Sequence, residues 1–251
     1  MQERRKGNFM DRGFAARYRQ FVILICGIAL LVVATLGNAA SVNFGARTLE
    51  IPAPGQNKPV ATSFPGVLEI NSGYLPPANR LVDMYVTPDQ VKEIGNAGHP
   101  ALDHYFELQV PRTLEGIHIP AEQFAQGRPN IKAGLEKEFG KIQTDADGLA
   151  RNGNQHLHEV TGNQSNVSMN SIGSIGIFRE ESWGVFFSMQ SAVAITGHTP
   201  IPMIISGAIV WINGQVLYLY AVSQGTGKAD IQWTQQSLNA WVNAIHAANP
   251  V

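Results

Sequence analysis

The stretch Trp211–Val222, WINGQVLYLYAV, decides the fold of this chain. Asn213 and Gly214 stand between two runs of β-branched and aromatic residues. Both central residues of a type I′ turn need a positive φ, which asparagine and glycine adopt at the lowest steric cost. The stretch therefore predicts a tight hairpin of two antiparallel strands.

Segments of the same character surround this hairpin. From Ser171 onward, three further runs of β-branched, aromatic and small residues follow one another, and together they predict a β-meander: IGSIGIF, WGVFFSMQSAVAIT and PMIISGAIVWI. After the hairpin, apolar residues between Asp230 and Ile245 recur at three- and four-residue spacing. This spacing predicts a helix that Asn249 and Pro250 end. Its two tryptophans indicate that the helix docks on the open face of the meander.

The first half of the body mixes strands and helices. Strands are predicted at Arg47–Ile51, Arg80–Val86, His104–Val110 and, after a hairpin tip at Asn152-Gly153, at His156–Val160. Helices are predicted at Thr87–Gly95, where Thr87 and Gln90 form a capping box, and within Ile119–Ile142, with its better part starting at Pro129. The proline-rich stretch Ile51–Pro77 is expected to run extended along the surface.

The N-terminal region is basic and then strongly apolar. Residues 1–40 hold six cationic and two acidic side chains, which gives this segment a net charge of +4 and leaves −5 for the rest. The run 21–37, FVILICGIALLVVATLG, is apolar or small throughout, and cations precede it. Such a pattern directs the chain across the cytoplasmic membrane and keeps the N-terminus inside.

Two fates of the apolar run stay open. The small residues that follow it favour cleavage by a signal peptidase, but 17 residues at a rise of about 1.5 Å each nearly span the membrane, so a retained anchor is the alternative. Either Met1 or Met10 can be the start. We expect a signal peptide or anchor at residues 1–40, an extended lead-in at 41–78 and one α+β domain at 79–251, placed in the periplasm or on the outer side of the inner membrane.

Composition excludes several kinds of site from the body. The single cysteine, Cys26, lies inside the apolar run, so the body has no disulfide, thiol nucleophile or thiolate metal site. An acidic body offers no basic surface for nucleic acid. No cofactor is indicated, and no catalytic residue can be identified.

The best metal candidates are His156, His158 and Glu159. If this segment is a strand, residues two apart share a face, and both imidazoles can reach one ion. Two ligands do not complete a zinc site, and further ligands are not apparent. A surface strand with two histidines is therefore the expected structure.

Two short motifs resemble known sites incompletely. GTGKAD, residues 225–230, lies between a strand and a helix, but Val222 and Ala229 stand where a phosphate loop needs glycine and serine or threonine. Ser174 lies in IGSIG, which lacks the first glycine of a nucleophile elbow and is expected within a strand. We expect a turn in the first case and close strand packing in the second.

Two long segments carry a family resemblance: Tyr74–Val91, YLPPANRLVDMYVTPDQV, and the stretch from Ala208 to Pro250. They resemble a group of exported bacterial proteins of unknown function and, more loosely, PsbP/Mog1-like domains. The resemblance implies an α+β sandwich of antiparallel sheet and flanking helices. It implies no activity and no functional residue.

The sequence thus favours an exported or membrane-anchored envelope protein that binds a partner protein or a small ligand without catalysing a reaction. An envelope hydrolase or a metal-dependent enzyme that uses His156 and His158 is the alternative. The cytoplasmic membrane is a further partner if residues 21–37 are retained.

Overall fold

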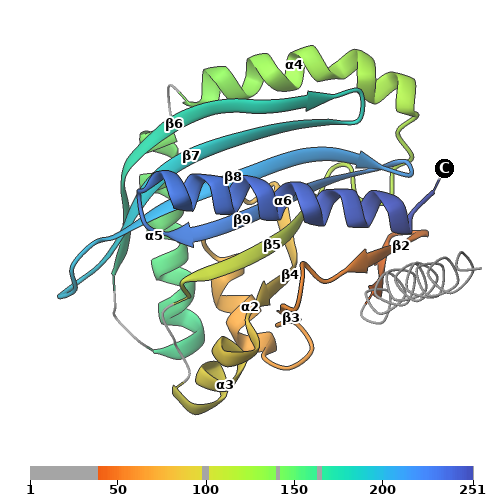
Figure 1. Ribbon diagram of the computed structural model, residues 1–251. Coiled ribbons are helices and arrows are strands. Elements are labelled where there is room, and N and C mark those ends of the chain that lie inside the picture. The colour runs from red at the N-terminus through yellow and green to blue at the C-terminus, as the bar shows by residue number, and fades with distance from the viewer. Residues whose placement is uncertain (1–38, 98–101, 140–141, 163–165, 251) are drawn as a thin grey trace, which may run out of the picture. The chain divides into compact units, whose positions relative to one another are not determined.

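The computed structural model describes residues 39–97, 102–139, 142–162 and 166–250 (Figure 1). Residues Ala40–Val251 form one compact unit of the chain. Its elements are, in chain order, β1 (Ala39–Phe44), β2 (Arg47–Pro52), β3 (Lys58–Pro59), α2 (Pro65–Ser72), β4 (Asn79–Val86), α3 (Pro88–Ala97), β5 (His104–Pro111), α4 (Ala121–Phe139), α5 (Ile142–Thr161), β6 (Val167–Glu181), β7 (Gly184–Ile195), β8 (Ile201–Ile212), β9 (Gln215–Gln224) and α6 (Lys228–Ala248).

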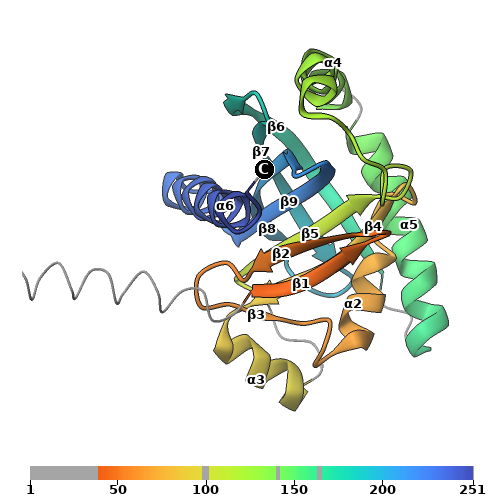
Figure 2. The same ribbon diagram turned by 90° about the vertical axis from the view of Figure 1, so that its right-hand side faces the viewer.

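One large antiparallel sheet organises these elements. Its strands lie in the order β3-β4-β5-β9-β8-β7-β6, and β1 and β2 pair with each other in a separate hairpin. The last four strands form the predicted meander. Its edge strand β9 pairs with β5, and this pairing joins the meander to the earlier strands. Helices flank this sheet (Figures 1 and 2), so the predicted α+β fold is confirmed.

The Asn-Gly hairpin forms as predicted. Asn213 and Gly214 have φ values of 44° and 90°, and Ile212 lies opposite Gln215 where the two strands begin to pair. Positive φ at both positions is the requirement of a type I′ turn, whose twist matches that of the strands. The turn therefore fixes the register of β8 against β9.

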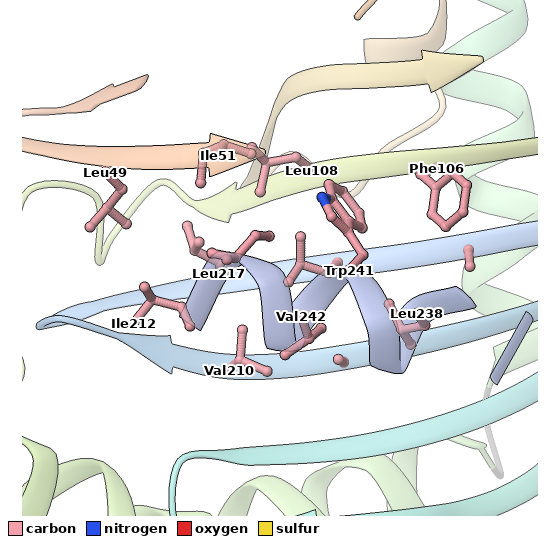
Figure 3. Packing of buried hydrophobic residues seen from close by; sticks show 14 of the residues in the cluster. Leu49, Ile51, Phe106, Leu108, Val210, Ile212, Leu217, Leu238, Trp241 and Val242 are labelled. Atoms are coloured by element: carbon pink, nitrogen blue, oxygen red, sulfur yellow. The ribbon is translucent and has the colours of Figure 1, made fainter. Parts of the chain in front are cut away.

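The main core lies between the sheet and α6. Leu238, Trp241, Val242 and Ile245 of α6 are buried together with apolar residues of β5, β7, β8 and β9. The Trp241 ring meets Tyr85 and Phe106 edge-on, with ring centroids 5.3 and 5.5 Å apart. Figure 3 shows Leu238, Trp241 and Val242 of α6 among the strand residues of this cluster, so the predicted docking of the last helix on the meander is confirmed.

The β1–β2 hairpin belongs to the same core. Phe44, Leu49 and Ile51 are almost completely buried against α6 and the sheet. The segment that follows is also more ordered than its prolines indicated. Instead of running extended over its whole length, it forms the two-residue strand β3 and the helix α2, in which Pro65 occupies the first turn, where a missing N–H is harmless.

The hairpin predicted at Asn152-Gly153 is wrong. Residues 142–161 form the helix α5, and the strand expected at His156–Val160 is the last part of that helix. Gly153 lies where α5 approaches Tyr74, and a Cβ at this position would overlap the Tyr74 ring. The glycine thus serves a close helix contact and not a turn.

Smaller departures concern helix ends. Thr87 and Gln90 form the predicted capping box, with Gln90 Oε1 accepting from Thr87 N–H at 2.9 Å, but the helix continues past Gly95. Pro129 lies inside α4, which is a single helix from Ala121. Residues 21–37 fall outside the described part of the chain. Within the described ranges, no helix has the length and apolar character needed to cross a membrane.

Candidate functional site

The sheet face opposite α6 carries a row of polar and aromatic side chains at its centre. Along β5, Phe106, Leu108 and Val110 enter the main core, so Tyr105, Glu107 and Gln109 point to the other face. The same alternation along β9 places Tyr218 and Tyr220 on that face. Glu107 lies directly opposite Tyr220, and Gln109 lies opposite Tyr218. We call these five side chains, Tyr105, Glu107, Gln109, Tyr218 and Tyr220, the polar strip.

Apolar clusters lie on both sides of the polar strip. On one side, residues of β4 and α3, including Met84 and Ile94, form a small cluster that touches Tyr105. On the other side, Phe124 of α4 packs on Trp211 and Val216, and Tyr218 borders this second cluster. The polar strip thus occupies the central strands between these two clusters.

A short relay of amides leads to the Glu107 carboxyl group. Asn79 Nδ2 donates to Gln109 Oε1 at 3.1 Å, and Gln109 Nε2 donates to Glu107 Oε2 at 2.8 Å. Both hydrogen bonds run in the same direction, so the relay presents a donor to one carboxyl oxygen and fixes the side chain. Within the described residues, Glu107 forms no ion pair. Its second oxygen, Oε1, remains an available acceptor.

The surroundings favour the neutral form of the carboxyl group. Desolvation raises the pKa of Glu107, and the hydrogen bond from Gln109 offsets only part of this effect. Desolvation also raises the pKa values of Tyr105 and Tyr220. The nearby Glu107 charge adds to the effect at Tyr105, and Tyr218 followed by Glu107 adds to it at Tyr220. Desolvation likewise raises the pKa of Tyr218. The tyrosines therefore remain neutral hydrogen-bonding groups at physiological pH.

These side chains are set back from the surface but not sealed from solvent. Tyr105, Glu107, Tyr218 and Tyr220 are all partly exposed. Solvent therefore reaches part of each of these side chains.

Aromatic rings border the strip next to Tyr220. Gly207 of β8 lies directly opposite Tyr220, and the Phe187 ring covers the place where a Cβ of residue 207 would be. Tyr220 and Phe187 meet edge-on at 6.3 Å, and Phe139 of α4 meets Phe187 at 5.9 Å. The absence of a side chain at Gly207 thus leaves room for the Phe187 ring, which lies beside Tyr220 at one side of the polar strip.

The histidines predicted as metal candidates lie elsewhere. His156 and His158 belong to α5. Residues two positions apart in a helix are rotated by about 200° around its axis and lie on nearly opposite sides, so these histidines do not share the face that joint ligation requires. His156 Nε2 lies 3.1 Å from the Glu69 carbonyl oxygen, and Gln155 Nε2 donates to Glu159 Oε1 at 2.8 Å. Across the described residues, no three groups of metal-ligating type come together.

The two incomplete motifs have structural roles. In the 225–230 loop, the Asp230 carboxylate accepts from Gly227 N–H at 2.9 Å and from Ser223 Oγ at 3.1 Å. An internal carboxylate thus uses an amide that a phosphate loop would offer to its ligand. Ser174 lies within β6, opposite Met189, as the sequence indicated.

Sequence reasoning missed the polar strip. The sequence predicts a strand at His104–Val110 but singles out none of its polar residues. The signal that could have found the strip is the coincidence of two such alternations, Tyr-x-Glu-x-Gln and Tyr-x-Tyr, in strands that prove to be neighbours. That pairing joins segments more than 100 residues apart, and no local pattern specifies it.

Comparisons with known proteins show no family for this chain. No protein-family model matches the chain, and no curated protein matches it. Two solved structures match at 12% identity over 84% of this chain and 90% of theirs: the Saccharomyces cerevisiae Ran-binding protein Mog1p, with a TM-score of 0.29, and a point mutant of Mog1, with a TM-score of 0.32. The chain therefore has a weak likeness to the Mog1 fold, and nothing about its function follows from that likeness.

Proposed function

We propose that this chain is an extracytoplasmic binding protein that recognises a small molecule at the polar strip and catalyses no reaction. The observation that carries this proposal is the Glu107 carboxyl group, held by Gln109 and left without a partner ion among the described residues. Burying a carboxyl group without a cation lowers the stability of the fold. A binding function explains why the chain retains one here.

The chemistry of the strip supports recognition. It offers one carboxyl group, the amide of Gln109 and three neutral phenols, all of which can form directed hydrogen bonds with a ligand. Aromatic walls add contact area at a small cost in conformational entropy. The alternative of a metal-dependent enzyme has lost its geometric basis, because His156 and His158 share a helix and not a strand face.

The proposed location rests on the N-terminal sequence. Residues 1–40 carry a net charge of +4, with cations preceding the apolar run 21–37, and this arrangement favours export of the body. Mass spectrometry of the native protein's N-terminus, combined with cell fractionation, tests it. A chain that starts within a few residues of Ala40 indicates a cleaved signal, and a membrane-bound chain that retains residues 21–37 indicates an anchor. A soluble cytosolic chain that starts at Met1 or Met10 would contradict the location.

The binding function is tested with a panel of small polar metabolites. We expect at least one compound to raise the melting temperature of the protein, with the shift lost in Tyr220→Ala and kept in Glu93→Gln, whose side chain is exposed on α3. Recovery of the compound unchanged after incubation supports binding without catalysis. Conversion of the compound, or an equal shift in the Tyr220→Ala variant, would overturn the proposal.

A further inference from the structure

The hydrogen-bond direction at the polar strip restricts the chemistry of its ligand. Within the relay, Asn79 donates to Gln109, and Gln109 donates to one oxygen of Glu107. What remains at the end of the relay is the second oxygen of Glu107, which accepts hydrogen bonds when the group is ionised. A ligand group that contacts this oxygen of the ionised carboxylate must therefore be a donor.

The charge balance points the same way. No cationic side chain in the described residues pairs with Glu107. The hydrogen bond from Gln109 favours its charged form, and the Glu107 charge in turn raises the pKa values of Tyr105 and Tyr220. The chain outside residues 1–40 carries a net charge of −5, which attracts cations and repels anions at long range. A cationic donor would form a charge-assisted hydrogen bond with Glu107, and such bonds are about twice as strong as neutral ones.

The rings around the carboxyl group suit an organic cation better than a metal ion. Tyr105 and Tyr220 flank Glu107, and the Phe187 ring lies next to Tyr220. Aromatic faces attract alkylammonium groups through their quadrupole and also bury the attached methylene groups. A hard metal ion would need several further oxygen ligands, and one carboxyl group with phenols does not provide a typical set.

We propose that the polar strip binds a small organic cation whose primary ammonium group donates to Glu107 Oε1 while its carbon chain lies against Tyr220 and Phe187. This inference rests on the proposed binding function and names the class of its ligand. Glu107 is the charge-recognising residue, Gln109 is a positioning residue, and the aromatic side chains supply the apolar contact.

The test uses three probes of similar shape and different charge: n-butylammonium, n-butanol and butyrate. Each is titrated into the full-length protein in mild detergent, and the NMR signals of tyrosine rings and labelled glutamate carboxyl groups are followed. We expect butylammonium to shift the Glu107 and Tyr220 signals and to bind on the order of tenfold more weakly in Glu107→Gln. The matched variant Glu93→Gln removes the same charge from an exposed position and should bind as the wild type does.

The outcomes separate this inference from the binding function. If butanol or butyrate binds at the strip as well as butylammonium, or if Glu107→Gln binds all three equally, the strip binds small molecules but does not select cations, and the inference fails alone. If butylammonium shifts no strip signal, the inference is also wrong, and the metabolite panel decides the binding function separately. Because Glu107→Gln removes a desolvated charge, this variant is expected to fold, and its melting curve checks that.

Discussion

The side-chain amide of Asn249 pairs with both backbone groups of Glu50. Glu50 N–H donates to Asn249 Oδ1 at 2.9 Å, and Asn249 Nδ2 donates to the Glu50 carbonyl at 2.8 Å. The residue that follows α6 therefore satisfies the backbone N–H and C=O of Glu50 in β2, as a neighbouring strand would. This contact joins residues 199 positions apart and ties the start of the body to its last helix.

Removal of that amide should destabilise the protein. Asn249→Ala leaves two backbone groups of Glu50 without their partner in a nearly buried place, and we expect a loss of about 1–3 kcal/mol in the free energy of unfolding. Asn243→Ala, at an exposed position of the same helix, should change it by less than about 0.5 kcal/mol. Urea unfolding measures both, and equal stability of the two variants would contradict the role of the contact.

Trp241 should be the most sensitive position of α6. Its ring is buried between Tyr85 and Phe106, and its Nε1 donates to the Pro52 carbonyl at 2.8 Å. Trp241→Ala is expected to lower the free energy of unfolding by about 3–5 kcal/mol, because it removes packing and leaves a cavity. Trp233→Ala, which removes a partly exposed ring, is the control and should cost clearly less in the same denaturant titration.

Tyr85 should tolerate the loss of its hydroxyl group. The Tyr85 hydroxyl is buried without a hydrogen-bond partner among the described residues, so Tyr85→Phe removes an unsatisfied polar atom. We expect unchanged or increased stability. Tyr74→Phe is the comparison, because the Tyr74 hydroxyl donates to Asn154 Oδ1 at 3.1 Å and its loss should cost about 0.5–1.5 kcal/mol. A larger loss in Tyr85→Phe than in Tyr74→Phe would show that Tyr85 has a partner.

Glu107 should make the protein less stable as the pH rises. Burial raises its pKa in the folded state above the ordinary value of 4.5, so the folded state holds the proton more tightly than the unfolded chain does. The contribution of Glu107 to stability is therefore greatest below the unfolded pKa and falls as the pH rises through the folded pKa. The neighbouring Tyr105 and Tyr220 have raised pKa values and do not titrate in this range.

The variant Glu107→Gln isolates this effect. Its free energy of unfolding, relative to that of the wild type, should increase as the pH rises above the ordinary Glu pKa of 4.5, because the variant has no proton to lose. Asp83 also has a raised pKa, but it is present in both proteins and cancels in the difference. Parallel pH profiles for the wild type and Glu107→Gln would show that Glu107 is not desolvated.

The elements predicted correctly from the sequence are those whose conformation is determined by residues close together in the chain. Asn213-Gly214 specifies its hairpin by backbone conformation, and the periodic apolar residues of α6 specify both the helix and its buried face. Asn152-Gly153 shows the limit of the same rule. There the glycine is required by the Tyr74 ring, a contact between distant segments, and the pair lies inside a helix.

The candidate site was harder to predict because it depends on strand order. The meander was evident from sequence, but the insertion of β5 beside β9 was not, and this pairing alone brings Glu107 opposite Tyr220. The sequence analysis chose His156 and His158 as metal candidates because histidine is a common metal ligand. Their segment was predicted as a strand and is part of the helix α5. The residues of the polar strip instead lie on β5 and β9, two strands in which the sequence showed no functional motif.

The most direct measurement of the central claim is the pKa of Glu107, followed through its carboxyl ¹³C signal in the folded wild-type protein and assigned by its absence in Glu107→Gln. A carboxyl group that is desolvated, without a partner ion and available to a cationic ligand should titrate above 4.5, and bound butylammonium should lower that pKa. A Glu107 pKa at or below 4.5 without ligand would contradict the account, because it would mean that water or a cation already stabilises the charge.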